Sequence, residues 1–296
     1  MKTKNISSLS KSRLKTLFGF SPGILAEILI LVLPVLEEAR TRRLTQRPDR
    51  KRPPRTHEGA PRQVTPRDQV LMTLLYLRHN VTHEIVGDLF GFSADSSEDA
   101  FHDVVPILRD LFPKEKWNAE KRFRKGLPPW TPDQIDRVII DSFETPIPRP
   151  SGKTLQKRMY SGKKKRHTLK SQVVTDQKGE ILDIEAGRPG PMADIEFYRK
   201  HPMPEPIADK PRLGDKAYVG TPGVETPMKK PKGRELTEEE KEKNREISGR
   251  RVYVEHGIRR LKGFKILRGD YRHALGLFPM VASAVVGLIH FSRILA

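Results

Sequence analysis

Asp136-Arg137-Val138-Ile139-Ile140-Asp141 is the stretch that decides the fold of this chain. Three β-branched residues in a row predict a buried β-strand, and Asp141 is expected at its end. A carboxylate beside a buried apolar strand is costly unless a cation, a backbone N–H group or a metal ion balances its charge. An aspartate that caps a turn is the ordinary alternative, so Asp141 alone does not distinguish a turn from a metal site.

The composition predicts a polyanionic partner. The chain has 296 residues, enough for one large domain or two smaller ones, and a formal net charge of +19. Nucleic acid is the first candidate for the partner and an anionic membrane surface the second. The absence of cysteine excludes disulfides, thiolate metal ligands and a cysteine nucleophile, and it predicts a cytoplasmic protein.

Two apolar runs are tested against membrane insertion. Residues 24–36 are too few to span a bilayer, and residues 274–296 are interrupted by Pro279, His290 and Arg293. Both runs are therefore interpreted as buried core helices, and no membrane partner is expected. The N-terminus shows no signal peptide, because no apolar segment follows its basic residues directly.

The first part of the chain predicts a helix-turn-helix domain at residues 63–113, after an N-terminal helical segment and an arginine-rich linker at residues 1–62. Thr65-Pro66 opens a helix, residues 84–90 form a second short helix, and Gly91 permits a sharp turn. Asp95 and Glu98 are expected as a capping box that opens the third helix. This third helix would be the recognition helix in the major groove, although other small three-helix bundles give the same pattern.

The second part of the chain predicts a catalytic domain of α/β class at residues 134–296, after a basic linker at residues 114–133. Strands are expected at residues 138–141, 167–175, 181–186, 212–215 and 224–228, with a hairpin turn at Gln177-Lys178-Gly179. Helices are expected at residues 192–200 and 235–262, followed by the apolar C-terminal helix. Prolines keep residues 145–150 out of the central ladder. This order of elements fits an RNase H-like fold.

Two further acids lie in informative surroundings. Asp215 ends a short strand in Gly214-Asp215-Lys216-Ala217-Tyr218. At about 100° per residue, one face of the helix around Glu255 gathers a single acid and three cations, Arg251, Glu255, Arg259 and Lys262. Such a face suits a carboxylate that binds a metal ion while its neighbours hold phosphates. An ordinary salt-bridged surface helix gives the same pattern.

Taken together, these motifs resemble a family, the DDE transposases of bacterial insertion sequences, of the insertion-sequence-five type. The resemblance covers about residues 64–292. Its motifs are Asp141 after a strand, the basic run from Tyr160 to Lys170, the run from Gly214 to Gly220, the spacing of Arg251, Glu255 and Lys262, and the run from Arg188 to Asp194. Two positions depart from the family pattern. Ser248 stands where the family has a tyrosine, and no histidine precedes Asp194.

The resemblance implies metal-dependent DNA strand cleavage and strand transfer by an endonuclease with two Mg²⁺ ions, for which Mn²⁺ can substitute. It assigns Asp141 to both ions and Asp215 and Glu255 to one side each. Lys153 to Lys170 contains eight Lys and Arg and no acid, which indicates a DNA-facing loop; a solvated basic hairpin is the alternative. The expected DNA contacts are Arg251, Arg259, Lys262, Lys163, Lys164, Lys165, Arg166, His167 and Lys170. The expected DNA partners are the terminal inverted repeats and the target, bound by a homodimer or a higher oligomer.

Two rival functions remain at this point. His256-Gly257-Ile258-Arg259 has the His-x-x-Arg spacing of tyrosine recombinases, but the last tyrosine, Tyr271, follows Arg259 too closely to be their nucleophile. The second rival is a DNA-binding regulator, or a domesticated transposase without strand-transfer activity. Three acids in metal-ligand positions speak against this rival, because a pure binder has no use for them.

Overall fold

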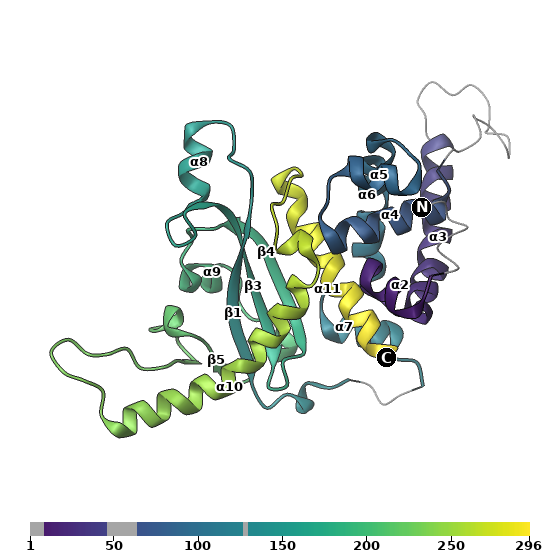
Figure 1. The fold of residues 1–296 in the computed structure, drawn as a ribbon. Helices are drawn as coiled ribbons and strands as arrows, with labels where there is room; N and C mark the ends of the chain where they lie inside the picture. The colour runs from purple at the N-terminus through teal and green to yellow at the C-terminus, as the bar shows by residue number, and fades with distance from the viewer. Residues whose placement is uncertain (1–8, 46–63, 127–129) are drawn as a thin grey trace. The chain divides into compact units, whose positions relative to one another are not determined.

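The chain forms two compact units, which Figure 1 draws as a ribbon. The structure, a computed structural model, describes residues 9–45, 64–126 and 130–296. The first unit comprises the described residues up to Phe112 together with residues 264–266 and 295–296. The second comprises the described residues of 113–263 and 267–294.

The described part of the first unit is helical. Its helices are α2 (Lys11–Phe18), α3 (Pro22–Thr45), α4 (Pro66–His79), α5 (His83–Phe90) and α6 (Ala94–Leu111). The buried side chains of α3 recur at helical spacing and include Leu25, Ile28, Val32 and Leu36. Helix α3 packs with this stripe against α4 and α6, so it continues through Pro34 and includes the first residues of the expected arginine-rich linker. Residues 46–62 of that linker lie outside the described residues.

Helices α4, α5 and α6 confirm the predicted helix-turn-helix. Thr65 caps α4, and α5 ends at Gly91, whose φ of +79° favours glycine. The predicted start of α6 was wrong by two residues. Ser93, not Asp95, is the N-cap, and its Oγ accepts a hydrogen bond from Ser96 N at 3.2 Å. Serine caps a helix as well as aspartate does, and the helix is capped by Ser93, two residues before the expected cap.

The second unit is built on a six-stranded mixed sheet. Its strands are β1 (Val138–Pro146), β2 (Tyr160–Ser161), β3 (Arg166–Asp176), β4 (Ile181–Pro189), β5 (Arg212–Leu213) and β6 (Val224–Glu225). The order is β2-β3-β1-β5-β6, with β4 also paired to β3. Strand β3 is antiparallel to β1 and β4, whereas β5 is parallel to β1. The predicted hairpin between β3 and β4 is confirmed, with Gly179 at a φ of +76°. An α/β unit that follows a helical unit in the chain agrees with the predicted RNase H-like class.

Helices cover both faces of the sheet. Helix α9 (Asp194–Lys200) lies over the face that carries Val138 and Ile140, and its Tyr198 joins their apolar cluster. Helix α10 (Glu238–Lys262) runs along β1 and β3 (Figure 1). Because side chains alternate along a strand, Asp141 and Phe143 belong to the face that α10 covers. Helix α8 (Lys153–Met159) connects β1 to β2.

Two expectations about this unit were wrong. The stretch 114–133, expected as a linker, contains helix α7 (Lys116–Phe123), which packs against β4 and α11 (Phe278–Ile294). Strand β1 does not end at Asp141 but continues to Pro146, so residues 145 and 146 lie in the ladder. The reason is pairing: β3 accompanies β1 over all nine residues, from Val138 opposite Asp176 to Pro146 opposite Thr168.

The apolar C-terminal segment is a core helix in this fold. The stretch Leu275–Ile294 is long and apolar enough to cross a membrane, but 61% of its most apolar window is buried inside the protein. Helix α11 packs against β4 and α7, and His290 Nε2 lies 2.9 Å from the carbonyl oxygen of Ile181. Its apolar character is accounted for by this packing.

Candidate active site

Asp141 lies at the point where β1 loses one of its two neighbours. The parallel pairing with β5 covers only Val138 opposite Arg212 and Ile139 opposite Leu213. Two residues later β1 has a neighbour on the β3 side alone. The carboxyl ends of parallel strands form an open edge where binding sites collect, so the topology leaves Asp141 without a β5 neighbour there although the strand itself continues.

The surroundings of Asp141 combine burial with opposing charges. Its Oδ1 accepts a hydrogen bond from Ser142 N at 2.7 Å, and its Oδ2 lies 3.5 Å from Arg251 Nη2. Burial raises the pKa of Asp141 to about 6; the Ser142 N–H and Arg251 oppose this rise, whereas Asp215 and Asp194 add to it. The charge at Asp141 is therefore only partly compensated, as expected of a carboxylate that binds a cation.

Asp215 follows β5 and opens the 3₁₀ turn Lys216–Tyr218. Its carboxylate accepts a hydrogen bond from Ala217 N at 2.8 Å. Gly214 precedes it, and a Cβ there would lie 3.0 Å from the Tyr218 side chain, so a larger residue would press against that ring. Asp141 lies in β1 just beyond its last pair with β5, and Asp215 lies just after β5. The two acids thus come from adjacent parallel strands, and the charge of Asp215 acts on Asp141.

Glu255 approaches from α10 on the face predicted from the sequence. The apolar side of α10 buries Val254, Ile258 and Leu261, and Gly257 lets the helix approach Thr175 and Gly179 closely. Asp141 and Glu255 line one pocket of about 890 Å³, which also contains a set of cations: Lys164, Arg166, Arg259, Lys262 and Arg268. Burial, with Lys164 and Arg268 nearby, lowers the pKa of Lys262, whose Nζ lies 5.3 Å from the centre of the Phe143 ring.

The donors at this site fit a hard divalent cation. Asp141, Asp215 and Glu255 supply only carboxylate oxygens, the ligands that Mg²⁺ and Mn²⁺ favour. Their ligand oxygens do not all lie within 4.8 Å of one another, and Glu255 is exposed. Like charges repel at such distances, so a cation would draw the three carboxylates closer together.

The predicted DNA contacts outside α10 differ in exposure: most lie on the exposed β2–β3 turn, whereas Lys170 is buried. Lys163, Lys164, Lys165 and Arg166 are exposed around the β2–β3 turn, where Lys165 has a φ of +55°. Arg166 forms an ion pair with Asp270, and the His167 ring packs edge-on against Tyr160. Lys170 is different, because only 6% of it is exposed and its Nζ lies 2.9 Å from Asp194 Oδ1. The expectation that Lys170 faces DNA is therefore wrong.

Several side chains beside Asp141 had not been predicted as part of the site. Ser142 Oγ donates a hydrogen bond to Asp194 Oδ1 at 2.5 Å. The Tyr218 hydroxyl is buried and has no hydrogen-bond partner among the described residues. Burial and the charges of Asp194, Asp141 and Asp215 raise the pKa of Tyr218 well above its ordinary value. Asp194 and Tyr218 stood in motifs of the resemblance, which was the only signal for them in the sequence.

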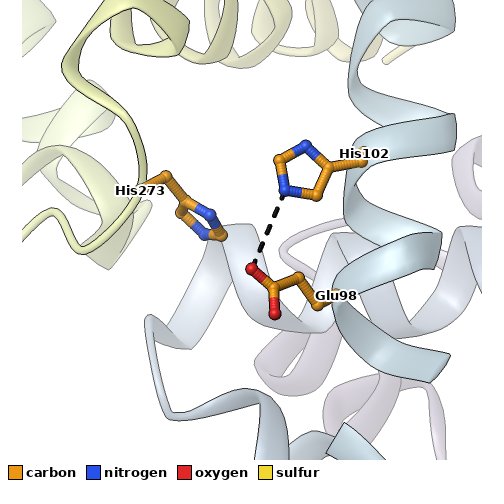
Figure 2. Close-up of side chains that lie close together, drawn as sticks. All are labelled: Glu98, His102 and His273. Carbon is orange, nitrogen blue, oxygen red and sulfur yellow. Dashed lines mark ion pairs between the residues drawn. The ribbon is translucent and has the colours of Figure 1, made fainter. Parts of the chain in front are cut away.

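Helix α6 presents an acidic surface, unlike an ordinary recognition helix. Asp95, Glu98 and Asp99 are exposed, and the sequence from His79 to Leu108 contains no lysine or arginine. Figure 2 shows Glu98 and His102 one turn apart on α6, with Nε2 3.8 Å from Oε1; His273, also drawn there, belongs to the other unit. These exposed acids do not attract phosphates, and the helix up to Leu108 lacks the lysine and arginine side chains that usually supply such contacts.

Comparison with known families decides the class of this site. Residues 140–290 match the model of the DDE superfamily endonuclease, and residues 62–114 match the helix-turn-helix of DDE superfamily endonuclease. The chain belongs to the DDE superfamily. Its match begins one residue before Asp141 and includes Asp215 and Glu255, so the site described above lies inside the endonuclease domain.

Two relatives place the chain among the insertion-sequence transposases of the DDE superfamily. A protein of Microchaete diplosiphon, named "Probable transposase for insertion sequence element IS702", is 34% identical over 231 residues, which are 76% of this chain and 79% of the relative. A protein of Streptomyces albus G, likewise named as a transposase for insertion sequence element IS112, is 27% identical over 240 residues, 78% of this chain and 84% of the relative. No solved structure matches the chain significantly. Membership in this family makes the chain a transposase that acts on DNA with divalent metal ions.

Proposed function

We propose that Asp141, Asp215 and Glu255 hold two Mg²⁺ ions, or Mn²⁺ in their place, in a site that cleaves and joins DNA strands. The observation that carries this proposal is the pocket shared by Asp141 and Glu255, which come from a strand and a helix distant in sequence. Bound ions would activate the attacking hydroxyl and offset the charge on the leaving oxygen.

The cations of the pocket have a separate task. Lys164, Arg166, Arg259, Lys262 and Arg268 line the same walls as the two acids, so a backbone phosphate beside the carboxylates would be held by them. Lys163, Lys165 and His167 extend this basic surface along the β2–β3 turn. Arg251 contacts Asp141 and would orient its carboxylate. The chain supplies no covalent link to DNA in this scheme, because positioned phosphates and an activated hydroxyl suffice.

The DNA partners follow from this chemistry. The sites of cleavage are the terminal inverted repeats of the element, and the released 3′-hydroxyl attacks a phosphodiester of the target DNA. Joining two ends to one target requires both ends in one complex, so we expect at least a homodimer on DNA. The chain would act in the cytoplasm, where bacterial DNA is accessible.

Cleavage of an end-containing DNA tests the proposal. The substrate is a DNA fragment with the ends of the element that encodes the chain, incubated with Mg²⁺ or Mn²⁺. Wild type is expected to nick at the ends, and Asp141→Asn is expected to bind the ends but leave them intact. Asp209→Asn, a change of an exposed aspartate of the same unit, is the control and should nick like wild type. Equal nicking by wild type and Asp141→Asn would contradict the metal assignment.

A further inference from the structure

A part-buried ionic hydrogen-bond chain lies on the far side of β1 from α10. Ser142 Oγ donates to Asp194 Oδ1 at 2.5 Å, and Lys170 Nζ donates to the same oxygen at 2.9 Å. Lys170 also donates to the carbonyl oxygen of Met192. The three side chains come from β1, from the first residue of α9, and from β3. One carboxylate oxygen thus ties together three elements directly behind Asp141.

The arrangement is more specific than fold stability requires. Apolar residues of similar size usually fill such a place at least as favourably as a buried ion pair. Lys170 is nearly inaccessible, so it cannot reach a phosphate, and Asp194 holds it in place. What the pair adds is a fixed acceptor for the Ser142 hydroxyl.

Ser142 is the covalent neighbour of Asp141 and points to the opposite face of β1. Beyond Ile139, β1 has lost its β5 partner, and on that side the ladder no longer restrains its twist. The Ser142 backbone N–H is also the donor that holds Asp141 Oδ1 at 2.7 Å. A restraint on Ser142 therefore restrains both the Asp141 backbone and the hydrogen bond that orients its carboxylate.

We propose that Asp194 and Lys170 are positioning residues that, through Ser142, fix the direction in which Asp141 presents its carboxylate to the metal ions. The inference rests on the proposed function of Asp141 as a metal ligand. Partners of this kind, one step behind a ligand, commonly change metal affinity by about 10- to 100-fold when they are removed. Asp194 and Lys170 touch neither the DNA nor the metal ions in this role.

Titration of the full chain with Mn²⁺ alone, by calorimetry, tests the proposal without reliance on activity. Ser142→Ala removes only the hydroxyl link, and we expect its Mn²⁺ affinity to fall by about 10- to 100-fold. Its thermal midpoint and its binding to DNA ends should stay at wild-type values. Ser283→Ala, which removes a hydroxyl bound to a carbonyl oxygen within α11, is the control and should keep the wild-type affinity.

A double variant separates positioning from simple loss of a buried charge. Lys170→Met with Asp194→Asn removes both charges together and leaves an amide oxygen as the acceptor for Ser142. We expect this double variant to bind Mn²⁺ more tightly than Ser142→Ala does. Wild-type affinity in Ser142→Ala beside lost affinity in Asp141→Asn would overturn the positioning role. Wild-type affinity in Asp141→Asn would instead overturn the metal assignment itself.

Discussion

Arg251 Nη2 lies 3.5 Å from Asp141 Oδ2, with 17% and 20% of the two side chains exposed. The guanidinium therefore occupies the neighbourhood in which a metal ion would meet Asp141. Its positive charge lowers the pKa of Asp141 against the larger effect of burial. Because Arg251 is one helical turn before Glu255 on α10, the same helix brings to the site both Glu255 and the counterion of Asp141.

Replacement of Arg251 by glutamine should shift the pH dependence of cleavage. Asp141 must lose its proton to bind a metal ion, so cleavage by wild type at subsaturating Mn²⁺ should rise as the pH increases through about 6. Loss of the nearby cation raises the pKa of Asp141 further, and the midpoint should move upward by roughly one pH unit. Arg250→Gln, at an exposed pair with Glu246, should leave the midpoint in place. A downward shift in Arg251→Gln would contradict the assigned contact.

Asp141→Asn should stabilise the fold while it abolishes cleavage. The pKa of Asp141 is about 6 in the folded chain and 3.8 without it, so the folded state holds the proton more tightly. Stability from this group is complete below about pH 4 and is lost as the pH rises through 6. Above pH 7 the ionised carboxylate then costs on the order of 2 kcal/mol, after allowance for its partial exposure.

The measurement is thermal unfolding of wild type and Asp141→Asn at pH 5 and pH 8. At pH 8 the variant should unfold about 4–8 °C higher, and the difference should shrink at pH 5. Burial raises the pKa of Asp183 to about 6 as well, but this group is present in both proteins and cancels in the comparison. A variant that is less stable than wild type at pH 8 would show that Asp141 is better compensated than its contacts indicate.

The exposed turn at Lys163, Lys164 and Lys165 should supply a large part of the salt dependence of DNA binding. Each phosphate contact that is lost reduces the slope of log affinity against log salt by about 0.9. Replacement of all three lysines by alanine should therefore reduce the slope by about 2–3. Lys229, Lys230 and Lys232 are exposed in the segment before α10, and their replacement removes the same charge elsewhere. Equal effects of the two triple variants would show a response to net charge alone.

The local sequence pattern predicts the strands and helices around the site but not which strands pair with one another. The apolar run Val138–Ile140 is sufficient to predict a strand, and an acid directly after such a run predicts that the strand ends there. The end of a strand depends on its neighbours, and β3 continues beside β1 to Pro146. Asp141 is free to line the pocket because β5 is short, and residues 136–141 carry no information about that distant segment.

Lys170 shows that local sequence also fails to predict whether a charged side chain is buried. In sequence it closes a basic run, and its neighbours Lys163 to Arg166 are indeed exposed. Alternation along β3 turns Lys170 inward, where Asp194 stands 2.9 Å away. A lysine is rarely buried unless a carboxylate pairs with it, and here that carboxylate comes from another element, α9. The face of α10 could be predicted because helical spacing is a local property.

Two glycines of α10 give a matched test of how closely this helix must approach the sheet. A Cβ at Gly257 would lie 2.9 Å from Thr175 Cγ2 and 3.3 Å from the carbonyl oxygen of Gly179, whereas nothing lies within 4 Å of a Cβ at Gly249. Alanine favours a helix over glycine by about 1 kcal/mol, so Gly249→Ala should stabilise the chain. At Gly257 overpacking costs about 1–3 kcal/mol, and Gly257→Ala should be the less stable variant.

Gly257→Ala should also reduce cleavage, because Glu255 lies two residues earlier on the same helix. Displacement of α10 from β3 would move Glu255 and Arg259 relative to Asp141, while the exposed β2–β3 turn would remain in place. Cleavage of end-containing DNA should therefore fall more than end binding does. The measurements are thermal midpoints, cleavage rates and end affinity for both variants. Full activity together with raised stability in Gly257→Ala would show that α10 tolerates a greater distance from β3 than this packing implies.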